Sequence, residues 1–136
     1  MVFVLDASIA AAWMLPDEQD DGADRVMQAL HTTSCLVPSL FWFEIRNLFL
    51  TAERRGRLRA GEALLSMSQL RALAIQDGSS GDHLVLELAK RRNLSGYDAS
   101  YLALAVDRKV PLATCDKRLA DASRREKVDL LGPLVG

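Results

Sequence analysis

Four acidic residues lie beside hydrophobic segments of this sequence, where an isolated charge is costly. Asp6 directly follows a short apolar run, Asp116 follows another, Glu44 interrupts a third, and Asp98 opens an amphipathic stretch. Carboxylates that are crowded together repel one another, and some are forced to stay protonated. A hard divalent cation such as Mg²⁺ or Mn²⁺ removes that conflict, because both ions prefer oxygen ligands. A metal held in this way can activate water and stabilise the transition state of phosphodiester hydrolysis.

The elements that must position these acids alternate along the chain. Short apolar runs predict strands, and longer stretches with apolar residues three or four apart predict helices. We expect strands at 2–5, 35–38, 73–75, 110–114 and 128–131, and helices at 9–14, 20–31, 40–53, 59–73, 82–93, 95–107 and 116–125. This alternation predicts an α/β fold with a short central parallel sheet and helices on both faces. Ligands of such sheets bind beyond the carboxyl ends of the strands, so the four acids are expected at one edge.

Each acid also has a purely structural interpretation. Asp6 and Asp116 each stand between a strand and a helix, where an aspartate commonly caps the first helical turn. Asp98 follows Ser95 by three residues, as in a capping box. Glu44 has no such role, and a glutamate in an apolar run is expected to be paired.

The composition indicates one ordinary domain, residues 1–136. The chain has 49% hydrophobic and 26% charged residues with a net charge of −1, which excludes a disordered chain and a strongly basic nucleic-acid binder. No apolar run approaches the roughly 18 residues of a membrane span, and the first residues lack the features of a signal peptide. Cys35 and Cys115 have no metal-ligand spacing, so free thiols in a cytoplasmic protein are expected.

Four ordered segments resemble a known family. They read VLDASIAAAW at 4–13, PSLFWFEIRN at 38–47, LSGYDASYLALA at 94–105 and LATCDKRLA at 112–120. With these motifs the chain resembles PIN-domain proteins, and among them the VapC-type toxin ribonucleases of type II toxin–antitoxin systems. Each motif is weak alone, but the set occurs in family order and covers nearly the whole chain.

The resemblance implies a single three-layer PIN-like domain with metal-dependent endoribonuclease activity. Carried over by position, the family's catalytic and metal-binding quartet falls on Asp6, Glu44, Asp98 and Asp116, with Mg²⁺ as cofactor and Mn²⁺ as a substitute. Smaller polar residues that support the quartet fall on Ser8, Asn47 and Thr114. Some PIN nucleases carry a further acid just beyond the last aspartate, whereas Lys117 follows it here, so a second metal site is not implied.

The resemblance also implies partners: an RNA substrate cleaved in single strands or loops, a cognate VapB-like antitoxin and a second copy in a homodimer. The bases outside the quartet are bunched, and Lys117 and Arg118 adjoin a quartet residue, so we expect them to contact RNA phosphate. The other bunches are expected to be solvated helix ends. The helix at 40–50 carries more large apolar residues than one core face requires, which leaves core packing and a partner contact both open.

Other functions remain open at this stage. A catalytically inactive PIN-like module that binds RNA or protein would not need four crowded acids. A receiver domain or an aspartyl-phosphate phosphatase would usually place a further acid near Asp6, where this chain has Ala7 and Ser8. A housekeeping PIN nuclease for RNA processing would use the same chemistry as a toxin.

Overall fold

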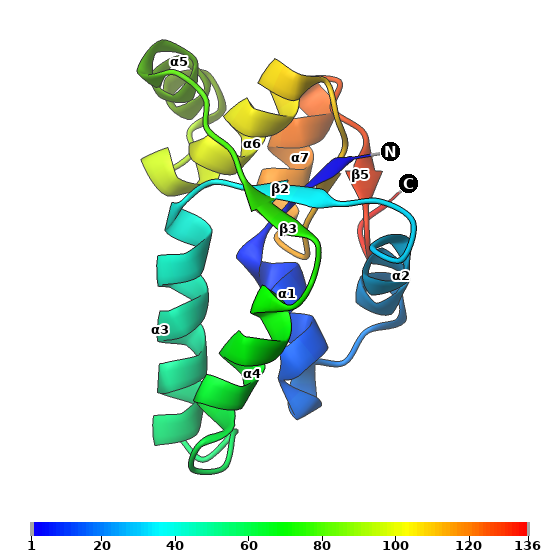
Figure 1. Ribbon diagram of the computed structural model, residues 1–136. Helices are drawn as coiled ribbons and strands as arrows, with labels where there is room; N and C mark the ends of the chain where they lie inside the picture. Colours follow the sequence, from blue (N-terminus) through cyan, green and yellow to red (C-terminus); the bar gives the residue numbers. More distant parts are fainter. Residues whose placement is uncertain (1, 136) are drawn as a thin grey trace.

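The computed structural model describes residues 2–135 and shows a five-stranded parallel sheet (Figure 1). The strand order is β3-β2-β1-β4-β5. The bounds are β1 Phe3–Leu5, β2 Cys35–Val37, β3 Ile75–Asp77, β4 Leu112–Ala113 and β5 Leu130–Leu131. β1 is buried along its length, as its unbroken apolar run predicts for a central strand covered on both faces.

Helices cover both faces of this sheet. Figure 1 shows α1 to α4 on one side and α5 to α7 on the other, which confirms the predicted three-layer α/β architecture. The helical segments are α1 Ala7–Met14, η1 Pro16–Glu18, α2 Asp21–Ala29, α3 Leu40–Arg54, α4 Glu62–Arg71, α5 Asp82–Arg92, α6 Gly96–Arg108 and α7 Lys117–Arg125, where η1 is a 3₁₀ turn. None of the helices between residues 2 and 135 is long and apolar enough to cross a membrane.

Buried side chains of α3 and α6 contribute much of the core. Phe41, Ile45 and Phe49 recur every four residues along α3 and are fully buried. Residues 101–105 of α6 are also fully buried, so this helix is almost enclosed. Phe43, in contrast, is 66% exposed, so the large residues of α3 divide between the core and the surface.

The predicted element boundaries need small corrections. The third strand lies at 75–77 rather than 73–75, and the helix before it spans 62–71 rather than 59–73. The fourth strand is only Leu112–Ala113, because Pro111 has no amide hydrogen for the sheet, although its carbonyl still accepts a hydrogen bond from the Val4 amide at 2.8 Å. The last strand is likewise shortened from 128–131 to Leu130–Leu131.

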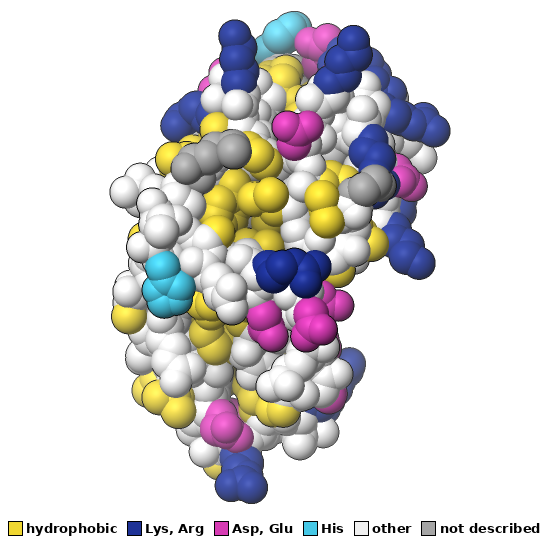
Figure 2. All heavy atoms as spheres, turned by 90° about the vertical axis from the view of Figure 1, so that its right-hand side faces the viewer, with side chains coloured by type: hydrophobic (Ala, Val, Ile, Leu, Met, Phe, Trp, Pro, Cys, Tyr) yellow, Lys and Arg dark blue, Asp and Glu magenta, His cyan; other side chains and the backbone are white. Residues whose placement is uncertain are grey.

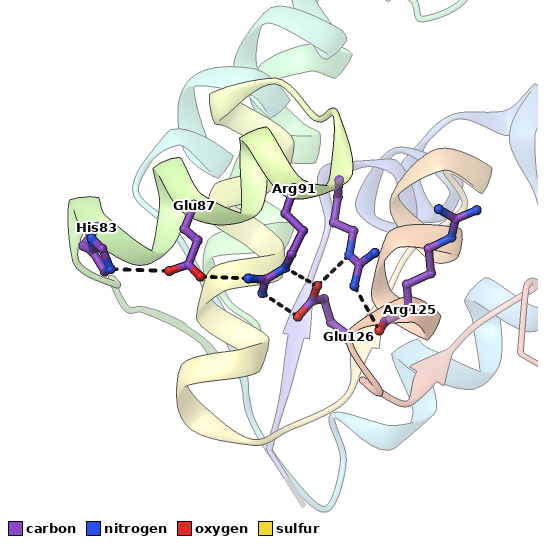
Figure 3. A network of polar contacts seen from close by, with 6 residues as sticks. His83, Glu87, Arg91, Arg125 and Glu126 are labelled. Carbon is purple, nitrogen blue, oxygen red and sulfur yellow. Dashed lines mark hydrogen bonds and ion pairs between the residues drawn. The ribbon is translucent and has the colours of Figure 1, made fainter.

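Ion pairs fix the periphery at two places. Arg57, in the α3–α4 connection, donates to both carboxylates of Asp17 and Glu18 in η1. Figure 3 shows the second place, where Glu126, just after α7, accepts from Arg91 and Arg92 of α5. The basic bunches at 54–59 and 90–92 therefore serve partly to join elements, rather than being only solvated helix ends.

The remaining Lys and Arg side chains are not spread evenly. Figure 2 shows one face of the molecule, with Lys and Arg gathered at the end formed by α5, α6 and α7 and a hydrophobic hollow below them. Bases on these helices and the turns after them include Lys90, Arg108, Lys109, Arg124, Arg125 and Lys127. This end of the molecule offers positive charge although the whole chain is nearly neutral.

Candidate active site

The carboxyl ends of two neighbouring strands place Asp6 and Asp116 at the same sheet edge. β1 and β4 pair in parallel, and the Asp6 amide continues the ladder by donating to the Ala113 carbonyl at 3.0 Å. Glu44 projects from the second turn of α3, which follows β2, and Asp98 lies in the first turn of α6. The predicted convergence of four segments on one edge therefore agrees with the topology.

Asp6 is held by two hydroxyl groups. The hydroxyls of Ser8 and Thr114 both donate to its Oδ2 atom, at 2.6 and 2.8 Å. Thr114 is fully buried and Asp6 is only 7% exposed, so these bonds fix the carboxylate in one orientation. The Ser8 hydroxyl also accepts the Cys115 amide at 2.9 Å, which ties the start of α1 to the end of β4. Ser8 and Thr114, which were predicted to support the quartet, therefore both hydrogen-bond to one of its members, Asp6.

Asp116 combines a structural role with its place at the site. Its Oδ1 atom accepts the amides of Arg118 and Leu119, at 2.9 and 3.4 Å, which makes it the N-cap of α7. Its own amide donates to the Thr114 hydroxyl at 2.9 Å. Capping leaves Oδ2 without any of these bonds, so the cap and a metal-binding role are compatible for this side chain.

Glu44 has a partner that the sequence analysis missed. The phenol of Tyr101 donates to Glu44 Oε1 at 2.6 Å. Tyr101 lies one turn after Asp98 on α6, so both side chains follow the same side of that helix. Burial raises the pKa of Tyr101 far above its usual range, and the bond to Glu44 adds to that rise, so the phenol remains a donor. The spacing of Asp98 and Tyr101 was the only sequence signal for this contact.

Asp98 lies in the capped first turn of α6 and close to a cation. The Ser95 hydroxyl accepts the Asp98 amide at 3.0 Å, which confirms Ser95 as the N-cap of α6 and leaves the Asp98 carboxylate outside that bond. The nearby Arg118 charge lowers the pKa of Asp98, although burial and Asp116 outweigh it. Arg118 itself donates to the Asn93 carbonyl at 2.9 Å, so its guanidinium is anchored close to the site.

The four carboxylates interact electrostatically with one another. Burial is the largest cause that raises the pKa of Asp6, Glu44 and Asp98. Hydrogen bonds from hydroxyl groups oppose the rise at Asp6 and Glu44. Neighbouring quartet members add to the rise at all three groups. The site is therefore an assembled cluster of like charges without enough cationic compensation.

The donor chemistry of this cluster suits a hard divalent cation. Within residues 2–135, no three His, Cys, Asp or Glu side chains stand close enough together to ligate one ion directly. Mg²⁺ usually keeps several of its waters and takes only one or two carboxylates directly, so a spaced quartet can hold it partly through water. A cation would also relieve the mutual repulsion that raises these pKa values.

Two other predicted site residues, Asn47 and Lys117, are exposed. Asn47 lies one turn after Glu44 on α3, is exposed, and makes no side-chain hydrogen bond within the described residues, so its supporting role stays a prediction. Lys117 is exposed in the first turn of α7 beside Asp116. Cys35 and Cys115 are free thiols, as expected.

Comparisons with known proteins identify the family of this chain. The PIN domain family matches residues 3–125. The chain is 33% identical over 128 residues to Ribonuclease VapC3 of Pyrobaculum aerophilum, covering 89% of this chain and 94% of that protein. The chain belongs to the PIN-domain family, as a VapC-type member. A second VapC-type relative is Ribonuclease VapC9 of Mycobacterium tuberculosis, 32% identical over 125 residues, with 92% of this chain and 94% of that protein covered.

The fold of this chain is also found among solved structures. The crystal structure of PAE2754 from Pyrobaculum aerophilum matches with a TM-score of 0.70 at 20% identity, covering 90% of this chain and 84% of that chain. At that identity the likeness concerns the fold alone. The family match and the VapC-type relatives carry the assignment, which rules out the receiver and phosphatase interpretations.

Proposed function

We propose that this VapC-type PIN protein is a metal-dependent endoribonuclease, the toxin of a VapBC-type toxin–antitoxin module. The observation that carries the proposal is the quartet of Asp6, Glu44, Asp98 and Asp116, gathered at one sheet edge by four separate segments. The names of its relatives as ribonucleases add the substrate class. The reaction is hydrolysis of a phosphodiester bond in single-stranded or loop RNA.

The quartet would hold Mg²⁺, or Mn²⁺ in its place, directly or through water. When bound, the ion supplies Lewis-acid stabilisation of the phosphodiester and lowers the pKa of an attacking water. Ser8 and Thr114 keep the Asp6 carboxylate in one orientation, and Tyr101 does the same for Glu44. Such fixed donors and acceptors avoid reorganisation during the reaction, which is where a preorganised site gains its rate advantage.

Lys117 and Arg118 would contact the phosphate backbone beside the quartet. Arg118 is already anchored by the Asn93 carbonyl and sits close enough to Asp98 to affect its pKa. A cation in this position attracts the RNA backbone without reading its sequence. The same acidic site would accept a basic side chain from a VapB-like antitoxin, since that cation competes with the metal for the carboxylates.

A homodimer in the cytoplasm is the assembly we propose. Leu64 and Leu65 of α4 are 74% and 55% exposed, and exposed leucines side by side favour a protein contact. Light scattering after size exclusion is expected to show a dimer, and Leu65→Asp is expected to shift it toward the monomer. A strict monomer at high concentration would contradict this part of the proposal.

The activity is tested by incubating the purified protein with total RNA and Mn²⁺ or Mg²⁺. We expect discrete fragments that disappear with EDTA and with Asp6→Ala. Circular dichroism of Asp6→Ala provides the control for folding. Intact RNA in every lane, together with RNA binding that does not respond to EDTA, would instead support the inactive RNA-binding module. Unspecific degradation that survives both EDTA and the substitution would indicate a contaminating nuclease and leave the chain without the proposed activity.

A further inference from the structure

Two exposed aromatic rings flank the acidic site. Phe43 directly precedes Glu44 and is 66% exposed, and Tyr97 directly precedes Asp98 and is 69% exposed. Each belongs to a different helix, α3 or α6, that also carries a quartet member. Exposing rings of this size is costly in water, and neither ring is needed by the core.

The two rings share a pocket with a quartet member. A cavity of about 300 Å³ is lined by Leu40, Phe43, Glu44 and Tyr97. Its walls are apolar or aromatic except for the Glu44 carboxylate, whose Oε1 atom accepts from Tyr101. A group that enters this pocket therefore lies directly beside the proposed phosphodiester site.

A cation lies over one of these rings. The Arg46 guanidinium lies over the Phe43 ring, with its carbon 4.7 Å from the ring centroid. Arg46 makes no ion pair within residues 2–135, so its charge is available to a phosphate. Flat aromatic surfaces next to an arginine and a phosphodiester site provide both kinds of contact that single-stranded nucleic acid uses.

We propose that this pocket binds an unpaired nucleobase of the RNA next to the scissile phosphate, stacked on Phe43 or Tyr97. The inference deepens the proposed function, on which it rests, by assigning a base subsite to the nuclease. An apolar protein segment without a basic residue fits less well, because it would cover the Glu44 carboxylate without offering it a partner. A nucleotide brings its own phosphate to the acids and its base to the rings. The subsite also explains why the substrate must be single-stranded, since a base in a duplex cannot enter the pocket.

The test uses an RNA oligonucleotide that spans one cleavage site found with total RNA. Phe43→Leu and Tyr97→Leu keep apolar volume but remove the aromatic face. The variant that lacks the ring on which the base stacks is expected to raise KM about tenfold, the effect of losing one base–aromatic stack. Leu86→Ala, an exposed leucine on α5, is the matched control and should leave KM unchanged. Tyr97→Phe should behave like the wild type, because it retains the ring.

The oligonucleotide supplies the second half of the test. Replacing single bases near the cleavage site by abasic residues should, at one position, weaken cleavage by the wild type about as much as the ring substitutions do. An abasic residue at that position should not weaken cleavage by the Phe43→Leu/Tyr97→Leu double variant any further. Equal KM values for the wild type and both leucine variants, or an abasic penalty that persists in the double variant, would overturn the subsite.

Binding separates this inference from the proposed activity. An oligouridylate with one 2-aminopurine should show quenched fluorescence when its base stacks on the wild type, and less quenching with the double variant. Quenching without any cleavage would sustain the base subsite and reject the nuclease activity. Cleavage with equal quenching and equal KM for the wild type and the double variant would support the nuclease activity and reject the base subsite. If the double variant changed only the oligomeric state or antitoxin binding, the pocket would be a protein interface, and the base subsite would be wrong.

Discussion

Glu126 and Asp6 are both well-shielded carboxylates, and their pKa values are displaced in opposite directions. Hydrogen bonds from Arg91 and Arg92 dominate at Glu126 and lower its pKa, whereas burial dominates at Asp6 and raises it. Glu126 joins two helices through charged partners (Figure 3), while Asp6 receives only neutral hydroxyls and faces other acids. The first arrangement stabilises the fold, whereas the second leaves a carboxylate whose charged form a bound cation would stabilise.

The difference shows how one chain uses the same functional group in two ways. A carboxylate whose charge is already balanced by arginines attracts a further cation less strongly. A carboxylate left with like-charged neighbours costs stability but can bind a metal or a basic side chain. Substitutions at three positions test this contrast.

The largest effect is expected from Asp98→Asn. The amide keeps the shape of the side chain, and the Ser95 cap uses the backbone, so the fold should persist. Cleavage of RNA should fall by about 100-fold or more, because under the proposed function a carboxylate of the metal site is lost. Initial rates on a defined oligonucleotide at saturating Mn²⁺ provide the measurement, and full activity in a folded variant would remove Asp98 from the quartet.

The same variant should be at least as stable as the wild type in EDTA. The pKa of Asp98 is raised in the fold, so its stabilising contribution is complete below the unfolded pKa and is lost as pH rises through the folded value. As pH rises from about 4 to 7, the melting temperature of Asp98→Asn should therefore increase relative to that of the wild type. A variant that is less stable at pH 7 would mean that Asp98 is a paired, structural acid.

A smaller effect is expected from Tyr101→Phe. Removing the hydroxyl deletes one hydrogen bond to Glu44 without changing the packing, so cleavage should fall about threefold to tenfold. That bond lowers the pKa of Glu44, so its loss raises the pKa and moves the acidic limb of the pH–rate profile toward higher pH. A uniform loss at every pH would show that Tyr101 acts only through packing.

The smallest effect is expected from Glu126→Gln, which should leave cleavage unchanged. Its free energy of unfolding at pH 7 should be about 1 kcal/mol below that of the wild type, since two arginines lose a charged partner. The pKa of Glu126 is lowered in the fold, so this contribution exists above the unfolded pKa and disappears as pH falls through the folded value. Urea unfolding at pH 7 and pH 3 measures the difference, and Glu87→Gln, at the more exposed end of the network, is the control with a smaller effect.

The sequence motifs predicted most residues of the candidate site. Asp6 and Asp116 could be located because each follows a buried strand, and parallel strands bring such residues to one edge. Glu44 stood out because a charge in an apolar helix needs a reason. Tyr101 was missed because a tyrosine within the run at 101–105 is typical of a core position, and only the tertiary structure brings its hydroxyl to Glu44.

Residue types and their periodicity along the chain determined the α/β class, the parallel sheet and the acids at its edge, because alternating periods of two kinds admit few other arrangements. They did not determine which arginines form ion pairs. Arg91, Arg92 and Arg57 have a carboxylate as partner, whereas Arg46 lies over an aromatic ring. They also left open which aromatics of α3 face outward. Those outcomes depend on contacts between residues far apart in the chain, so only the tertiary structure decided that Phe43 and Tyr97 would line one pocket with Glu44.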